Sequence, residues 1–306
     1  MKTFFAMTAA ALALAAGVWA QADEGPSMSD LQLLTVPRGE LPPGEADLAT
    51  KLEFARAMIL GGKAAEALTT LDEISARDLA GNFTVEVFYY KAFAFDMLGK
   101  YDAAVANYQE ALTRRPDDPV ILLALGQAYL DAGKDDDARA SFDKVLAKTP
   151  EDSQALTGLA YLDMRGGDDA AARAKLERAV VADGRNALAL SYLGLLEMGE
   201  HQFDLARKHL EDAVALAPEN LTANYNLAGI YLMQKDYAKA ELHYRRVVTK
   251  KPADGDAWYY LALALEAQNR IDEALDAADA AVQHGASVGN VIEMVDRLQR
   301  KLNEKK

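Results

Sequence analysis

Few side chains in this sequence have types and spacings suited to chemistry, and two histidines stand out. His209 and His243 are 34 residues apart. In a chain built of repeats of that length, the two side chains occupy equivalent positions of adjacent repeats, where they can form a metal site or a pH-sensitive pair. The spacing suggests no third ligand, and the column runs beside core positions, so a structural role is favoured. We predict no metal and no other cofactor.

Two acidic clusters, Asp135-Asp136-Asp137 and Asp168-Asp169, are the next candidates. They lack the alternating ligands and the closing Glu of a calcium loop, so helix capping explains them better. The chain has no Cys, which excludes disulfides, thiolate metal sites and a Cys nucleophile. It also lacks a Gly-rich phosphate loop, a nucleophile elbow and a His-Glu-x-x-His helix. We therefore predict that the chain is not an enzyme and has no catalytic residues.

The first 22 residues have the pattern of a secretory signal. Met1-Lys2 is a basic start, an apolar stretch follows, and Ala20-Gln21-Ala22 offers small residues for cleavage. Cleavage near Ala22 predicts an exported protein, most typically of a bacterial periplasm. The alternative is an uncleaved inner-membrane anchor, because the apolar stretch approaches the roughly 20 residues needed to cross a bilayer.

Residues 23–47 are rich in Pro and Gly and are expected to be an extended linker. The whole chain has a formal net charge of -14, and loss of the leader with its single Lys2 makes it -15. Such an excess of acid repels nucleic acid phosphates and anionic lipid. We expect no nucleic acid partner, and no direct membrane binding after signal cleavage.

An internal repeat of 34 residues follows the linker. Pro116, Pro150, Pro218 and Pro252 are separated by multiples of that period, and Gly184 stands at the missing place. One column is always Ala and a second holds only small residues, as expected where packed helices leave little space. The Ala column is Ala104, Ala138, Ala172, Ala206, Ala240 and Ala274, and the small column is Ala92, Gly126, Ala160, Gly194, Ala228 and Ala262.

The pattern Leu122-x-x-Leu125-Gly126-x-x-Tyr129, followed by Ala138-x-x-x-Phe142 and Pro150, resembles the tetratricopeptide repeat. The resemblance implies an all-α fold, a right-handed α-solenoid of about seven helical hairpins. Asp102, Asp136, Asp204 and Asp272 recur just before the Ala column, where we expect them to cap the second helix of each hairpin. The predicted units are 48–84, 85–118, 119–152, 153–186, 187–220, 221–254 and 255–288.

Residues 289–306 are predicted to form a C-terminal capping helix with a basic tail. Their apolar residues fall on one helical stripe, which suits a helix that covers the last hairpin. The alternative is a docking helix for a partner or a membrane surface. The stripe consists of Val288, Val291, Ile292, Val295, Leu298 and Leu302.

The resemblance also implies a concave groove lined by the first helix of each hairpin. The Lys and Asn of the family's carboxylate clamps are missing from it, and of an Asn ladder only Asn226 is present. The lining is apolar, aromatic and rich in Met, which favours an apolar segment of a protein or peptide. An alternative is that adjacent helices or the linker cover it. The predicted partner-binding residues are Tyr89, Phe93, Met97, Leu123, Gln127, Tyr161, Met164, Leu195, Met198, Tyr225, Leu232, Tyr259 and Leu263.

These observations predict a non-catalytic scaffold or adaptor that binds a component of a cell-envelope assembly. The alternatives are an architectural protein whose repeats self-assemble, and an adaptor anchored in the inner membrane by an uncleaved leader.

Overall fold

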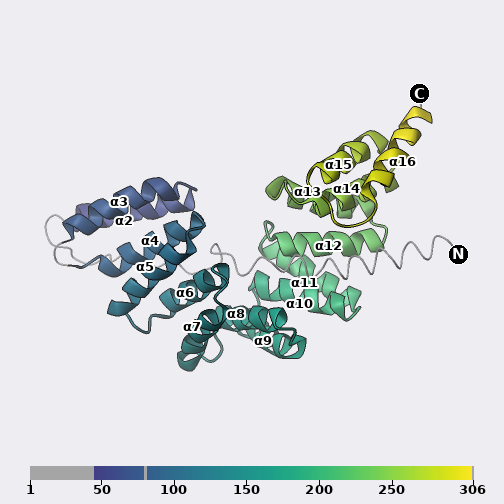
Figure 1. Ribbon diagram of the computed structural model, residues 1–306. Helices are drawn as coiled ribbons and strands as arrows, with labels where there is room; N and C mark the ends of the chain where they lie inside the picture. Colours follow the sequence, from purple (N-terminus) through teal and green to yellow (C-terminus); the bar gives the residue numbers. More distant parts are fainter. Residues whose placement is uncertain (1–44, 79–80, 305–306) are drawn as a thin grey trace. The chain divides into compact units, whose positions relative to one another are not determined.

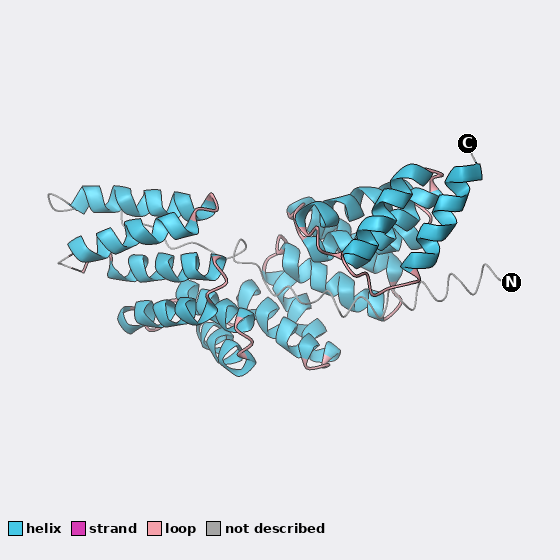
Figure 2. Cartoon of the chain, turned by 45° about the horizontal axis from the view of Figure 1, so that its top comes forward, coloured by secondary structure: helices cyan, strands magenta, loops and turns pink. Residues whose placement is uncertain are grey.

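The computed structural model describes residues 45–78 and 81–304 of the 306-residue chain. Every regular element in this part is an α-helix, and short loops connect successive helices (Figure 2). The predicted signal, residues 1–22, and most of the predicted linker, 23–47, lie outside the described residues. The first described helix begins at Glu45, three residues before the expected start of the first repeat at Leu48.

Consecutive helices pack in pairs, and the chain divides into two compact units between Asp183 and Gly184. Within each unit, the two helices of a hairpin contact each other and successive hairpins contact one another, which is the packing of an α-solenoid (Figure 1). The first unit contains α2 (Glu45–Leu60), α3 (Ala64–Arg77), α4 (Thr84–Met97), α5 (Tyr101–Arg114), α6 (Pro119–Asp131), α7 (Asp135–Lys148), α8 (Ser153–Arg165) and α9 (Asp169–Ala182).

The second unit contains three hairpins and one final helix. The break at Gly184 coincides with the one place in the series of repeat ends where Gly replaces Pro. Its helices are α10 (Ala187–Gly199), α11 (Phe203–Leu216), α12 (Leu221–Met233), α13 (Tyr237–Lys250), α14 (Gly255–Ala267), α15 (Ile271–Gln283) and α16 (Val291–Glu304).

The small residues of the first helices make room for a large side chain of the second helix. A Cβ atom on Gly126 would lie 2.6 Å from Cε1 of Phe142, and one on Gly158 would lie 2.6 Å from Cε2 of the same ring. A Cβ on Gly194 would likewise lie 2.6 Å from Cγ of Leu210. The two glycines therefore flank the buried Phe142 ring, which locks α7 between α6 and α8.

The turn inside each hairpin contains a residue in the left-handed conformation, again at the repeat period. In the first unit it is glycine, for example Gly99 and Gly133, with φ of 67° and 70°. In the second unit His201, Lys235 and Asn269 occupy the same column, with φ of 62°, 64° and 61°. In the left-handed conformation a Cβ atom crowds the backbone. The turns of the second unit therefore carry backbone strain, which the glycines of the first unit avoid because they have no Cβ.

The residues predicted to cap the second helices do not do so. Asp102, Asp136, Asp204 and Asp272 are each the second residue of their helix, so they lie inside the first turn and interact with the helix dipole instead. Of the acidic clusters, Asp168 does cap α9 by accepting from Ala171 N. A regular column of caps precedes the first helices: Asp118, Asp152, Asn186, Asn220 and Asp254.

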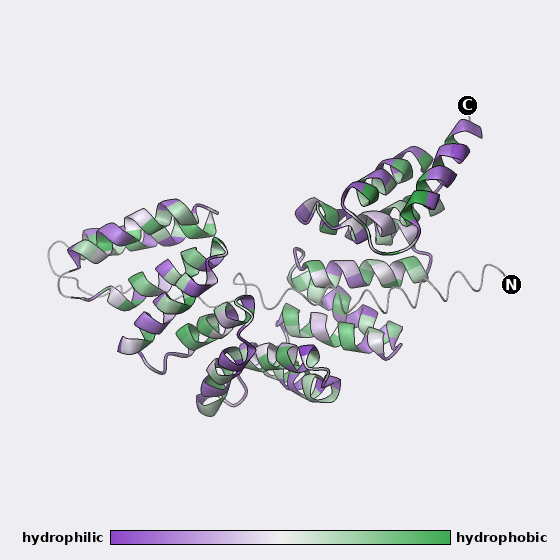
Figure 3. Ribbon diagram, in the orientation of Figure 1, coloured by the Kyte–Doolittle hydropathy of each residue, from purple (hydrophilic) through white to green (hydrophobic). Residues whose placement is uncertain are grey.

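The C-terminal helix α16 packs on α15, as a capping helix would. Val291, Met294 and Leu298 are buried, whereas Ile292 is 69% exposed. The prediction placed Ile292 in the buried stripe, but the stripe runs through Met294 instead. Residues toward the end of α16 are mostly hydrophilic (Figure 3). Among the described helices, none is long and apolar enough to cross a membrane.

Candidate functional site

The thirteen predicted groove residues lie on the first helices of the hairpins, from α4 to α14. Met97 is 51% exposed, and Leu232, Tyr259 and Leu263 are half-buried. The accessible members therefore cluster at the end of α4 in the first unit and on α12 and α14 in the second. The other nine are buried: Tyr89, Phe93, Leu123, Gln127, Tyr161, Met164, Leu195, Met198 and Tyr225.

Two of the predicted tyrosines are packed into the core between helices. The Tyr89 ring meets Tyr108 of the paired helix edge-on, with 5.5 Å between centroids. Tyr225 meets Tyr244 in the same way at 5.6 Å, and contacts Tyr260 of the next hairpin at 6.1 Å. Burial raises the pKa of both predicted tyrosines. Their first contribution is to stability, and their role in binding remains a prediction.

An acidic group that the sequence reasoning did not single out lies where α4 and α6 pack together. Its members are Asp96, Gln127 and Asp131, which we call the Asp96 group. Nε2 of Gln127 donates to Oδ1 of Asp131 over 3.1 Å. Asp96 is 5% exposed, and neither of its carboxylate oxygens accepts a hydrogen bond. Asp96 shares its repeat column with the predicted groove residues Met164 and Met198, and Asp131 shares the column of Met97, and that was the available signal.

Within the Asp96 group, the carboxyl of Asp96 is held away from water, whereas Asp131 is exposed. Burial, together with the charge of Asp131, raises the pKa of Asp96 to about 7. Desolvation also raises the pKa of Asp131, although the hydrogen bond from Gln127 opposes the rise. Near neutral pH the protonated and the ionised forms of Asp96 are therefore both populated.

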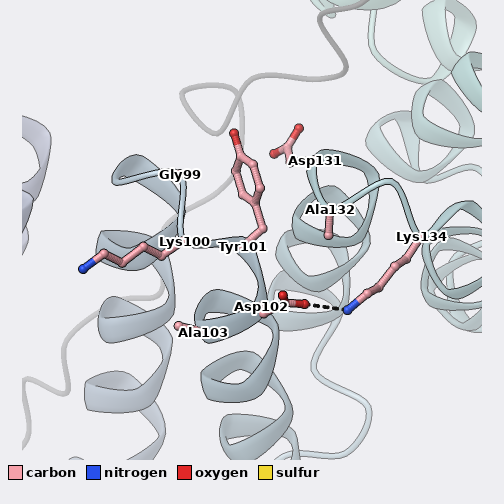
Figure 4. A pocket seen from close by; sticks show the side chains of 8 residues that line it. All are labelled: Gly99, Lys100, Tyr101, Asp102, Ala103, Asp131, Ala132 and Lys134. Atoms are coloured by element: carbon pink, nitrogen blue, oxygen red, sulfur yellow. Dashed lines mark hydrogen bonds and ion pairs between the residues drawn. The ribbon is translucent and has the colours of Figure 1, made fainter.

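A cleft of about 410 Å³ leads to Asp131 from the hairpin turns that follow α4 and α6. Figure 4 shows the Asp131 carboxylate beside the ring of Tyr101 at one end of this cleft. At the other end Lys134 pairs with Asp102 over 2.7 Å. Tyr101 is 36% exposed, so this entrance offers an aromatic face next to a carboxylate.

The second unit has a cleft of about 340 Å³ between α11, α12 and α13, with Glu211 and Arg246 in its wall. His243 also lines it and makes a 2.9 Å hydrogen bond from Nδ1 to Oδ1 of Asn224. Because Nδ2 of Asn224 donates to two backbone carbonyls, its oxygen must be the acceptor, so the His243 proton is on Nδ1. Burial, with the charge of Arg246, lowers the pKa of His243 to about 4.

The two histidines of the repeat column have separate partners. His209 faces the buried carboxylate of Glu197, with Nδ1 2.9 Å from Oε2, whereas His243 faces Asn224. In the part of the chain that the structure describes, no three His, Asp or Glu side chains gather in a metal-binding group. The geometry thus gives each histidine a hydrogen-bonding role between the two helices of its own hairpin.

Comparison with known proteins agrees with this architecture. A tetratricopeptide-repeat profile matches residues 97–160 and 231–287, and a second profile of the same repeat matches residues 192–255. The chain belongs to the tetratricopeptide-repeat family. Repeats of this family generally build non-catalytic scaffolds for protein interactions. No curated protein sequence matches the chain.

Solved structures that resemble the chain share its fold at low sequence identity. A tetratricopeptide repeat protein from Parabacteroides merdae has a TM-score of 0.54 and 16% identity, covering 83% of this chain and 99% of that one. A chain of the APC/C hetero-tetramer Cut9-Hcn1 has a TM-score of 0.59 and 20% identity, over 87% of this chain and 52% of its own. PilF of Pseudomonas aeruginosa has a TM-score of 0.53 and 21% identity, over 63% and 87%.

Proposed function

We propose that the chain is an exported, non-catalytic adaptor that holds an apolar segment of another envelope protein along the first helices of its hairpins. One observation carries the proposal: groove positions on consecutive first helices present apolar side chains that remain accessible. In the second unit these are Leu232, Tyr259 and Leu263. Half-buried apolar side chains on a rigid helical surface are suited to a partner segment, because they are ordered before it binds.

Export is supported by the leader pattern. Intact-mass measurement of the chain recovered from a bacterial envelope fraction tests it. A mature protein that begins near Asp23 is expected. A mass that includes residues 1–22 would favour the membrane-anchored alternative.

Site-specific crosslinking in cells tests the adaptor function. A photoreactive residue replaces Leu263 on α14, and a matched probe replaces Val181 on α9, which is 88% exposed on a second helix. A discrete crosslinked protein is expected from position 263 and not from position 181. The same adducts from both positions, or none from either, would argue against a partner on the first helices.

A further inference from the structure

The Asp96 group contains more hydrogen-bond acceptors than donors. Both carboxylate oxygens of Asp96 and Oε1 of Gln127 are buried without a partner. The amide nitrogen of Gln127 already donates to Asp131. The buried hydroxyl of Tyr108 is also unpartnered, but it supplies a single donor. When Asp96 is ionised, these three buried acceptors face the Tyr108 hydroxyl as the one unpartnered buried donor that the described residues place beside them, which is unfavourable unless a further donor arrives.

The same chain shows how a carboxylate in this column is satisfied. Glu266 lies five repeat periods after Asp96, at the same position of its repeat. The guanidinium of Arg297 on α16 binds both Glu266 oxygens, at 3.0 and 2.7 Å, and Lys301 adds a third bond at 2.8 Å. These bonds lower the pKa of Glu266 despite its burial, whereas Asp96, without such a partner, has a raised pKa.

The surroundings of Asp96 are apolar and partly exposed. The two residues that follow it, Met97 and Leu98, are 51% and 39% exposed, and Tyr101 is 36% exposed beside the cleft that reaches Asp131. A ligand at this place meets negative charge and apolar surface together. A bare metal ion does not match, because two carboxylates are too few ligands and no group of three gathers in the described residues.

We propose that the Asp96 group is a subsite for a Lys or Arg side chain of the partner segment, with flanking apolar residues of that segment on Met97 and Tyr101. The ligand pairs with Asp96 much as Arg297 and Lys301 pair with Glu266. An ammonium or guanidinium supplies several donors and a positive charge, which is what buried acceptors without donors require. This inference rests on the proposed function, since it assumes that a protein segment binds.

Selection from a displayed library of random 12-residue peptides tests the subsite and the proposed function separately. The purified chain is expected to enrich peptides that combine Lys or Arg with neighbouring apolar residues. A variant with Asp96→Asn and Asp131→Asn is expected to keep the apolar preference and lose the cationic one. The control, Asp143→Asn with Asp212→Asn, removes the same charge from exposed positions and is expected to select as the parent does.

The affinity of one selected peptide gives a quantitative test. Asp96→Asn is expected to weaken binding at least tenfold, and replacing the peptide's cationic residue with Gln is expected to do the same. Because both changes remove one interaction, combining them should weaken binding little further. Binding to the parent should also weaken as pH falls from about 8 to 6, since protonation of Asp96, with Asp131 and Tyr108 facing it, competes with the cation.

The outcomes are distinguishable. Enrichment of apolar peptides without Lys or Arg, or a cationic preference that survives Asp96→Asn with Asp131→Asn, would overturn the subsite and leave the adaptor intact. Failure to enrich any peptide would argue against the proposed function itself. A cationic preference lost equally in the exposed-charge control would show attraction to net charge only, and the subsite would again be overturned.

Discussion

At the residue scale, Asp96 is a carboxyl whose burial weakens the fold. Its raised pKa of about 7, against an ordinary 3.8, means that the folded chain binds more protons than the unfolded chain between those pH values. The free energy of unfolding must therefore fall as pH rises through that window. Residues that lower stability are often retained where a functional site needs them.

We predict that Asp96→Asn stabilises the free protein at pH 8, by on the order of 1–3 kcal/mol, and that the gain vanishes near pH 4. Denaturant unfolding at both pH values measures it. The matched control is Asp163→Asn, because Asp163 is a buried carboxylate that pairs with Arg139 and Lys175. That change should destabilise the chain. Equal effects of the two substitutions would contradict this account of Asp96.

His243 has the opposite protonation behaviour. Burial and Arg246 lower its pKa to about 4 from an ordinary 6.5, while Glu211 opposes the shift and Lys239 adds to it. Between pH 6.5 and 4, His243 is therefore protonated in the unfolded chain but neutral in the folded chain. Its contribution to the free energy of unfolding is complete above pH 6.5 and decreases toward pH 4.

We predict that His243→Gln flattens this part of the stability profile, by on the order of 1–3 kcal/mol across the window, because Gln can donate to Asn224 but does not titrate there. Thermal unfolding between pH 4 and 7 measures the slope. His284→Gln, at an exposed position, is the control and should leave the slope as it is in the parent. An unchanged slope in His243→Gln would assign the pH dependence to other groups.

At the element scale, the ring of Phe142 joins consecutive hairpins because Gly126 and Gly158 leave room on its two sides. Ala has a helix propensity about 1 kcal/mol better than Gly. The Cβ of Ala at position 158 would nevertheless overlap the ring, and overpacking a buried site typically costs about 1–3 kcal/mol.

We therefore predict that Gly158→Ala lowers the free energy of unfolding by about 1–2 kcal/mol, and that adding Phe142→Leu recovers part of the loss. Leu is the residue of the same column at Leu176 and Leu210. Gly199→Ala is the control, because a Cβ there meets no neighbour. Equilibrium unfolding of the single and double variants measures the coupling. A Gly158→Ala chain as stable as the parent would show that α6, α7 and α8 relax without loss.

The elements themselves were largely predictable. The period and the small column predicted the hairpins, because local sequence determines where helices start, stop and approach. The caps were misplaced: a run of acids before Ala138 suggested a cap, yet Asp136 lies inside its helix, while Asp118 and Asn186 cap the first helices. A difference of two residues in the helix start decides between these roles, and composition does not resolve it.

The candidate site was less predictable, for a physical reason. The columns of Tyr225 and Asp96 both follow from the repeat, but the sequence does not show that Tyr225 packs on Tyr244 and Tyr260. Nor does it show that Asp96 lacks a partner while Glu266, in the same column, pairs with Arg297. Whether a buried group is satisfied depends on side chains that are distant in sequence.

At the scale of the whole molecule, stacked repeats end in apolar faces that need a cover. In the second unit α16 supplies it: Leu298 is fully buried against the last hairpin, and Arg297 with Lys301 ties the helix to Glu266. The outer side of α16 presents Ile292 instead, 69% exposed. One side of α16 is thus buried on the last hairpin and the other is exposed.

We predict that Leu298→Asp releases this cover, because a charge in the buried seam is strongly unfavourable, and that the chain loses on the order of 2–4 kcal/mol of stability in its last repeat. The uncovered face of α15 should then associate with other copies, so sedimentation velocity should show species whose size grows with concentration. Ile292→Asp carries the same charge on the exposed side and should sediment as the parent does.

The same two variants, Leu298→Asp and Ile292→Asp, also test the alternative that the repeats of different copies self-assemble. If repeats associate end to end through a face that α16 covers, the parent should remain unassociated and Leu298→Asp should associate. If association uses the outer side of α16, the parent should associate and Ile292→Asp should abolish it. Because the two substitutions place the same carboxylate on opposite sides of one helix, a difference in sedimentation assigns the contact to a face and not to net charge.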